Sequence, residues 1–270
     1  MAVELTTYSP SAAVQTCRPR APAGHTTSWT LFNIATVPGV QDRIAEELDS
    51  LGLLAKPGCP APRELELDDL KKMPYLTAAT KEAMRMLPVV SIMGRVAGKD
   101  MTCGPYRIPK GTIVATPLFA IQNTKHNWEA PQEFRPERWL HVPIECWSYN
   151  SQDAGGKVAA AAAAVAPGAA PAALAGSNGG SGGMNAAAVA SSSKRGITFM
   201  PFSEGPRNCV GQSLAKMEVM TLLAKLLATF RIELAPEMGG REGVRSREST
   251  HLTLQTAGTK GIRCHLHPRC

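Results

Sequence analysis

The chain has 270 residues, of which 44% are hydrophobic and 5% aromatic, and its formal net charge is +7. This length and composition allow a packed core in one large domain or two small ones. The basic residues are scattered and lack interleaved aromatics, which disfavours a nucleic-acid-binding protein and favours contact of a basic face with an anionic membrane or an acidic partner.

Composition divides the chain into four stretches. Residues 1–22 are irregular, and residues 23–148 alternate helical and strand signals. Residues 149–195 are rich in Ala, Gly and Ser, and residues 196–270 return to a globular composition. Because the third stretch cannot bury enough apolar surface to offset the entropy lost on ordering, we predict that it is a flexible insertion.

No membrane anchor is expected in this chain. The amino-terminal sequence MAVELTTYSPSAAVQTCRPRAP lacks the apolar stretch of a signal peptide. The longest weakly apolar run, residues 158–176, is almost all alanine, and Pro167 and Pro171 interrupt it. Such a run is too weakly apolar and too broken to span a bilayer.

Helices and then strands are predicted along residues 23–148. Helical spacing of apolar residues predicts a helix between Pro38 and Gly52, and Pro74 precedes a second helix over residues 75–87. Strand signals at residues 101–108, followed by the sequence GTIVAT, predict a hairpin with a glycine near its turn, at position 111. The sequence FRPERW, at 134–139, predicts an ordered loop.

The strongest helix of the chain is predicted over residues 210–230. Its apolar residues form a wide stripe, which is typical of a helix in the core. The stripe consists of Leu214, Met217, Met220, Leu223, Leu227 and Phe230. Alternation after this helix predicts short strands at residues 231–234, 250–256 and 262–267.

Seven cysteines are spread along the chain, an odd number without a C-x-x-C pair. We therefore expect a reducing compartment and no disulfide framework. The tail CHLHPRC brings together Cys264, His265, His267 and Cys270, but their spacing matches no standard zinc finger. We expect this tail to form an edge strand.

Cys209 is the candidate for the central chemistry. It stands at the start of the predicted long helix, where the helix partial charge and unpaired N–H groups favour a thiolate. Gly205 permits a tight turn before it, and Gly211 leaves space for a flat molecule to approach. Phe202 supplies an aromatic face, and Arg207 offers a cation for a carboxylate. The alternative is a cysteine that only packs, but five residues at this spacing would arise by chance in on the order of one chain in ten thousand.

These residues fit the pattern F-x-x-G-x-R-x-C-x-G, and the sequence here resembles the cytochrome P450 family. The resemblance implies a mainly α fold with small β-sheets (α+β), whereas periodicity alone gives only a mixed α+β chain. It also implies a haem b cofactor (iron protoporphyrin IX), with Cys209 as the thiolate ligand of the iron. In the same loop, Phe202 and Gly211 would adjoin the haem, and Arg207 would bind a propionate.

Two further motifs resemble that family. Glu82 and Arg85 lie three residues apart, on one face of a predicted helix, and Arg95 follows after a proline. The sequence FRPERW resembles the P-E-R-F segment, with Trp139 where phenylalanine is commoner. The resemblance implies a structural network of Glu82, Arg85 and Arg138, without which haem would not be incorporated. It also places Arg95 on a propionate.

The sequence AGHTTS, at residues 23–28, resembles the oxygen-binding helix of the family, A-G-x-(D/E)-T-(T/S). Thr27 falls on the threonine that hydrogen-bonds dioxygen and relays protons, which is a catalytic role. Thr26 stands where the family has an acid, a departure that bears on proton delivery. Taken alone, the hexapeptide also suits a Ser/Thr-rich helix cap.

The resemblance covers residues 23–148 and 196–267, the carboxy-terminal half of a typical family member. It implies a monooxygenase, an oxidoreductase that reduces molecular oxygen and hydroxylates a lipophilic small molecule. Residues 89–94 are apolar and resemble a segment that borders the substrate. No flavin or nicotinamide fingerprint is present, so an NADPH-dependent reductase or a ferredoxin is expected to donate electrons.

For the full-length family member, the resemblance implies the cytosolic face of the endoplasmic reticulum membrane. Two alternatives to a monooxygenase stay open. One is a truncated, non-catalytic haem-thiolate remnant that keeps the motifs but cannot close its pocket. The other is a haem-thiolate isomerase or dehydratase that rearranges peroxides without a reductase. The threonine expected to bind dioxygen, Thr27, disfavours this alternative, whereas Thr26 in place of the family's acid favours it.

Overall fold

The structure is a computed structural model. The residues it describes are 2–5, 21–58, 62–147, 197–250, 254–256 and 261–269. The predicted flexible insertion, residues 149–195, lies outside them, as does most of the irregular stretch that precedes the first helix.

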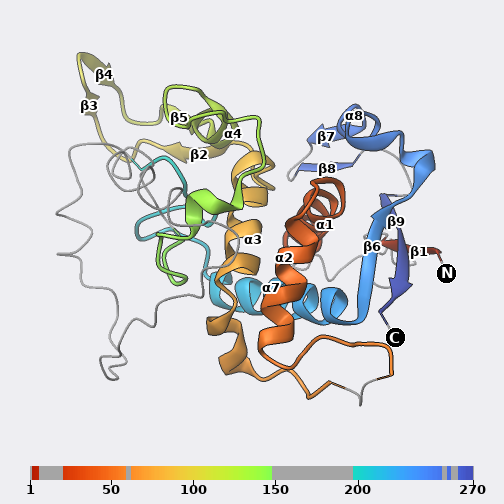
Figure 1. The fold of residues 1–270 in the computed structure, drawn as a ribbon. Helices are drawn as coiled ribbons and strands as arrows, with labels where there is room; N and C mark the ends of the chain where they lie inside the picture. Colours follow the sequence, from red (N-terminus) through yellow and green to blue (C-terminus); the bar gives the residue numbers. More distant parts are fainter. Residues whose placement is uncertain are drawn as a thin grey trace, which may run out of the picture.

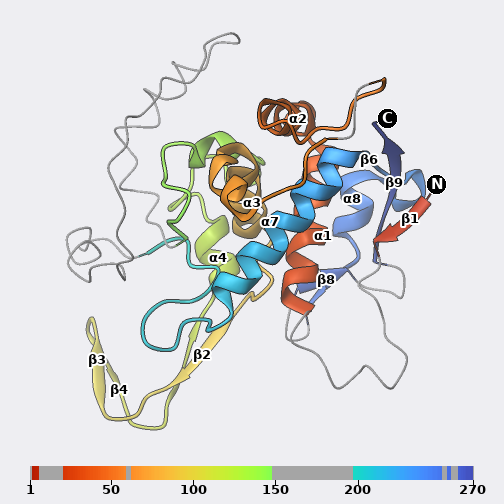
Figure 2. The same ribbon diagram turned by 90° about the horizontal axis from the view of Figure 1, so that it is seen from below.

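Four long helices form the centre of the molecule (Figure 1). They are α1 (Ala21–Thr36), α2 (Val40–Ser50), α3 (Pro74–Met86) and α7 (Gln212–Thr229). Seen from below, α7 runs between α3 and α1 (Figure 2). The largest apolar cluster joins all four; among its least exposed members are Phe32, Ile44, Leu48, Leu76, Leu223 and Leu227.

The predicted helix boundaries agree with these elements to within a few residues. Pro74 occupies the first turn of α3, where its missing N–H costs no hydrogen bond. Gly39, with φ of 79°, precedes α2, and Gly52, with φ of 70°, follows it. A glycine adopts this left-handed conformation without strain, which is why the chain turns at these two points.

Short helical turns lie between the long helices or after the last of them. They are η2 (Leu67–Lys72), α4 (Leu118–Asn123), η3 (Pro136–Trp139), η5 (Pro236–Met238) and α8 (Gly240–Arg245). The predicted ordered loop FRPERW therefore contains one 3-10 turn. Within the described part of the chain, no helix is both long and apolar enough to cross a bilayer.

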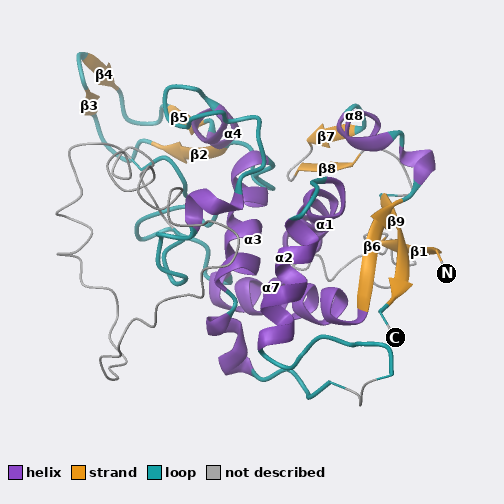
Figure 3. Ribbon diagram, in the orientation of Figure 1, coloured by secondary structure: helices purple, strands orange, loops and turns teal. Residues whose placement is uncertain are grey.

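An antiparallel three-stranded sheet lies beside the helices, next to both chain ends (Figure 3). Its order is β1 (Ala2–Leu5), β9 (Ile262–Pro268) and β6 (Phe230–Leu234). The cysteine- and histidine-containing tail is thus the central strand, so the prediction of an edge strand was wrong. The buried side chain of Cys264 faces the main core, and no metal-holding group of three or more His, Cys, Asp or Glu occurs in the described ranges.

Three two-stranded pairs complete the fold. Strand β2 (Met93–Val96) pairs with β5 (Ile113–Thr116), and β3 (Met101–Cys103) pairs with β4 (Tyr106–Ile108). The predicted hairpin between residues 101–108 and GTIVAT was therefore wrong. Gly104, with φ of 55°, turns the chain inside the first segment, and GTIVAT pairs instead with the strand before it.

The third pair joins β7 (Glu248–Thr250) to β8 (Leu254–Thr256). Together these elements make the fold the predicted mixture of helices with small antiparallel sheets.

The apolar stripe of α7 is buried only in part. Met220, Leu223 and Leu227 are in the core, but Leu214 is 63% exposed and Met217 is 39% exposed. The prediction that the whole stripe is core was wrong for this amino-terminal half. Periodicity shows which side of a helix is apolar, but it does not show how far along the helix other elements cover that side.

Candidate functional site

The loop that leads into α7 is folded tightly on itself. The N–H of Ser203 donates to the carbonyl of Met200 at 3.0 Å, and the N–H of Cys209 donates to the carbonyl of Phe202 at 2.8 Å. Gly205, between these two bonds, has φ of 81°, a conformation in which other residues are strained. The loop thereby fixes Cys209 just ahead of the amino end of α7, with its side chain exposed.

Cys209 and the apolar residues that follow it in the chain are exposed. A Cβ atom placed on Gly211 would lie 4.0 Å from Sγ, in van der Waals contact, so a side chain there would border the sulfur. Val210, next to Cys209 in the chain, is fully exposed, and Leu214, in the first turn of α7, is 63% exposed. Exposed apolar side chains around an accessible thiol are typical of a surface that another group covers.

Arg95, on β2, ties this loop to the neighbouring strand pair. Its guanidinium donates to the hydroxyl of Ser203 and to the carbonyl of Arg207, both at 3.3 Å. The loop and β2 lie side by side in Figure 2. Two of the predicted site arginines, 95 and 207, therefore meet at the cysteine loop, and both have exposed side chains.

Glu82, on α3, is the centre of a buried ionic network. Its carboxylate accepts two hydrogen bonds from Arg85, at 2.9 and 3.0 Å, and one from the Nε of Arg138, at 3.0 Å. The side chains of Glu82 and Arg85 are 0% exposed, and that of Arg138 is 11% exposed. Burial by itself raises the pKa of Glu82, but Arg85 and Arg138 outweigh it and hold this pKa below its usual range.

Two further donors to Glu82 were not foreseen from the sequence. The indole N–H of Trp139 donates at 2.9 Å, and the backbone N–H of Arg135 donates at 3.0 Å. Phenylalanine at position 139 would have no N–H to donate. The departure from the P-E-R-F pattern is the sequence signal that could have pointed to this bond.

Gln122, on α4, connects the Glu82 network to the cysteine loop, a role that was not predicted from the sequence. Its carbonyl accepts from Arg85 at 2.8 Å, and its side-chain oxygen accepts from the N–H of Met200 at 3.4 Å. Its side-chain amide group donates to the carbonyl of Met84 at 3.2 Å. Because Gln122 is fully buried, these bonds hold α3, α4 and the start of the loop together.

Phe202 anchors the loop on its other side. Its ring packs edge-on against Trp147 at 5.9 Å between centroids, and the ammonium of Lys216 lies 5.3 Å from the Phe202 ring centre. Phe202 thus contributes both a carbonyl that orders Cys209 and a ring that fixes the loop on α7. The aromatic face predicted from the sequence is therefore occupied partly by neighbouring protein groups.

Thr27 lies on α1, and its side chain is only 6% exposed. Its hydroxyl donates to the carbonyl of Ala23 at 2.9 Å, which leaves the oxygen lone pairs free to accept. Thr26 donates in the same manner to Pro22. Within the described ranges, no hydrogen bond joins Thr27 to the cysteine loop, so the structure does not bring these two predicted groups into direct contact.

The chemistry of the cysteine loop fits a haem. A soft thiol beside a position that lacks a side chain suits an iron ligand. Two exposed guanidinium groups suit the propionates, and the exposed apolar side chains of Val210 and Leu214 suit the macrocycle. The fold is therefore of the α+β class, and the loop before α7 presents a cysteine that could ligate a haem iron.

Comparison with known proteins places the chain in a family. The family model for cytochrome P450 matches residues 23–149 and 185–255, which together make up more than half of the chain. The chain belongs to the cytochrome P450 family, and its fold is a partial form of that family's fold.

Individual relatives agree with this assignment. The chain is 31% identical to mouse cytochrome P450 4V2 over an alignment of 216 residues. This alignment covers 78% of this chain and 31% of the mouse protein. It is 28% identical to bovine cytochrome P450 3A28 over 212 residues, again 78% of this chain and 31% of the relative. A mouse protein named leukotriene-B4 omega-hydroxylase 3 is 29% identical over 206 residues, 76% of this chain and 29% of that protein. The chain thus spans about a third of the length of these relatives.

Proposed function

We propose that this chain carries the haem-thiolate site of a monooxygenase that hydroxylates a lipophilic small molecule. The observation that carries the proposal is the exposed Cys209, held by the Phe202 carbonyl ahead of α7, in a chain of the cytochrome P450 family. The name of one relative, an omega-hydroxylase, supports hydroxylation as the reaction. When bound, the haem supplies reductive activation of molecular oxygen, which no side chain can supply.

In this proposal the loop holds the cofactor. Cys209, just ahead of the amino end of α7, would be the ligand of the iron as a thiolate. Arg95 and Arg207 bind the two propionates as charged donors. Gly211 keeps the approach to the sulfur free of side-chain atoms.

The Glu82, Arg85 and Arg138 network is structural in this proposal. It fixes α3 to the turn η3, and Gln122 carries its rigidity to the first residue of the cysteine loop. A ligand loop held in one conformation does not lose entropy when the cofactor binds, so the network raises haem affinity without contacting the haem.

Thr27 is proposed to hold a proton at its Oγ1. Its hydroxyl now donates to the Ala23 carbonyl, and rotation about the Cβ–Oγ1 bond would direct the same O–H toward a molecule bound beside α1. Thr26 has a hydroxyl in place of the family's acid, so a proton reaching Thr27 has no carboxylate source next to it on the helix. We therefore expect slow proton delivery.

The proposal includes a substrate class and an electron donor. Val89 and Ile92 are apolar residues of the segment expected to border the substrate; Val89 is buried, and Ile92 is exposed. An apolar segment there suits a lipophilic molecule. Electrons would come from an NADPH-dependent reductase or a ferredoxin, and haem b is the proposed form of the cofactor. The cytosolic face of the endoplasmic reticulum membrane is the proposed location of the full-length protein.

The test is turnover of the haem-loaded chain in two reactions, one with dodecanoic acid and one with a fatty-acid hydroperoxide in place of it. A hydroxylated product that needs NADPH, reductase and oxygen, and that Cys209→Ser abolishes, is the expected result. Rearrangement of a fatty-acid hydroperoxide without reductase would instead identify an isomerase or dehydratase. Haem bound through Cys209 without either activity would identify a non-catalytic remnant.

A further inference from the structure

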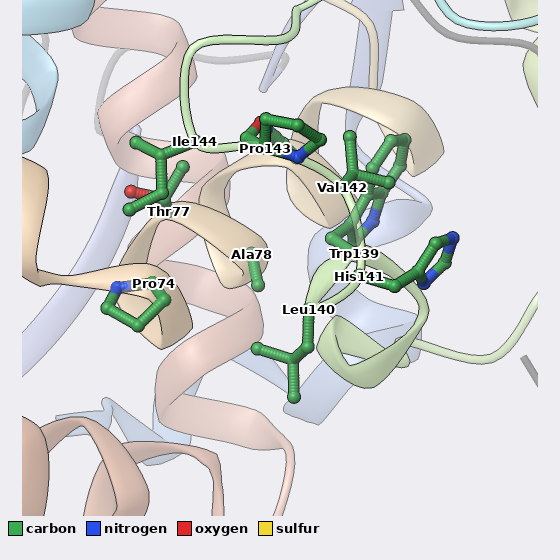
Figure 4. A pocket seen from close by; sticks show the side chains of 10 residues that line it. Pro74, Thr77, Ala78, Trp139, Leu140, His141, Val142, Pro143 and Ile144 are labelled. Carbon is green, nitrogen blue, oxygen red and sulfur yellow. The ribbon is translucent and has the colours of Figure 1, made fainter. Parts of the chain in front are cut away.

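A cavity whose walls include no residue of the cysteine loop lies between α3 and the segment that follows η3 (Figure 4). Its volume is about 280 Å³, close to the lower end of the range of about 300–1,000 Å³ that is usual for small-molecule sites. Its walls are mostly apolar. They include Ala78 from α3, and Leu140, Val142 and Ile144 from the segment that faces it.

Lys81 brings a buried positive charge to this cavity. Its side chain lies in α3, is 1% exposed, and donates one hydrogen bond, to the carbonyl of Pro143 at 2.8 Å. An ammonium has three donors, and no carboxylate of the described residues forms an ion pair with this one. Glu145 and Cys146 favour the charged ammonium and the Trp147 ring lies 5.3 Å from Nζ, but burial outweighs them, so an anion within hydrogen-bond distance would stabilise the charge further.

Thr77 provides a second polar group on the same wall. Its side chain is 2% exposed, and among the described residues its hydroxyl has no hydrogen-bond partner. Thr77 and Lys81 are four residues apart on α3, so their side chains lie on one face of the helix, about 5–6 Å apart at Cβ. Because both residues line the cavity, one carboxylate bound there could accept from both groups.

We propose that this cavity binds a small carboxylic acid with an apolar body, whose carboxylate accepts hydrogen bonds from Lys81 Nζ and Thr77 Oγ1. The apolar body packs on Ala78, Leu140 and Val142. The cavity also touches Trp139, which donates to Glu82, so a bound acid would support the wall of the structural network as well.

The experiment is calorimetric titration of the full chain with hexanoate at pH 7, with hexan-1-ol as the neutral comparison. We expect hexanoate to bind at least about tenfold more tightly than the alcohol, because a hydrogen bond to a charged group contributes more than one between neutral groups. Equal affinity for acid and alcohol, or no binding by the folded chain, would overturn the proposal. This comparison needs no substitution.

Substitutions then locate the carboxylate. Thr77→Val keeps the shape of the side chain and should weaken hexanoate binding about three- to tenfold, with little change for the alcohol. Lys81→Met should weaken it by more than tenfold. The matched control is Lys99→Met, since Lys99 is exposed after β2 and is not among the residues that line this cavity. Unchanged affinity in Thr77→Val and Lys81→Met would place the acid elsewhere.

Binding should also depend on pH. Burial lowers the pKa of Lys81 to about 8, with Lys216 acting in the same direction and Cys146 and Glu145 opposing it. Hexanoate affinity should therefore stay constant from pH 6 to 7 and fall above about pH 8, as Lys81 loses its proton. The wild-type chain should show this fall and the Thr77→Val variant should show it too, whereas Lys81→Met should bind independently of pH in this range.

Discussion

Replacement of Glu82 by glutamine is the sharpest perturbation of the described fold. Glutamine has the same shape, but it removes the negative charge between two buried guanidinium groups, those of Arg85 and Arg138. It also turns one acceptor oxygen into an NH2 group that faces N–H donors. At Oε1 these donors come from Arg85, Arg138 and the Arg135 backbone, and at Oε2 from Arg85 and Trp139.

The expected loss in free energy of unfolding is about 3–5 kcal/mol, the usual cost of leaving a buried charge without its partner. The whole stability of a domain is only about 5–15 kcal/mol, so the variant should lose a large part of it. With a urea m-value near 3 kcal/mol/M, the unfolding midpoint should fall by about 1–2 M. Tryptophan fluorescence reports the transition, because Trp128 and Trp139 pack beside the network.

The matched control is Glu64→Gln. Its side chain is 94% exposed and lies 3.9 Å from Lys225, so its stability should change by no more than about 0.5 kcal/mol. If Glu82→Gln unfolded at the same urea concentration as this control, the network would not be a stabilising feature of the fold.

Three other outcomes follow from the same contacts. Trp139→Phe should lower stability by about 1–3 kcal/mol in urea unfolding, because a buried carboxylate loses one donor; an unchanged midpoint would refute the role of the indole N–H. Gly243→Ala should lower the melting temperature, since its Cβ would lie 2.2 Å from the Met238 carbonyl oxygen, whereas Gly98→Ala, with no atom within 4 Å, should not. Stability should also fall as the pH drops below about 4.5, because the pKa of Glu82 is lower in the folded state than in the unfolded state. The contribution of Glu82 to the free energy of unfolding is complete above the unfolded-state pKa and is lost as the pH falls toward the folded-state pKa. A pH-independent midpoint between pH 5 and 3 would contradict this last outcome.

Local signals explain which features could be predicted from the sequence. A proline at the start of α3 and a glycine after α2 are backbone requirements that a short window shows. The pairing of Glu82 with Arg85 is likewise local, because residues three apart lie on one helix face. The tight turn at Gly205 belongs to the same class.

Features that depend on distant partners could not be predicted in this way. The tail became a central strand because β1, at the other end of the chain, pairs with its free edge. GTIVAT had two possible partners, and its own alternation does not distinguish them. Gln122 and Trp139 are polar groups with no periodic pattern, and their roles appear only once α3 lies beside them. Burial along α7 could not be predicted for the same reason: the apolar stripe does not show whether another element covers its amino-terminal half.

The most direct test of the central proposal is the spectrum of the haem-loaded chain, reduced and placed under carbon monoxide. Thiolate ligation by Cys209 predicts a strongly red-shifted Soret band that Cys209→Ser abolishes. Cys103→Ser is the matched control, because Cys103 is also exposed but lies on β3, and its spectrum should match that of the unsubstituted chain. A red-shifted band that persists in Cys209→Ser would contradict the assignment of Cys209 as the ligand.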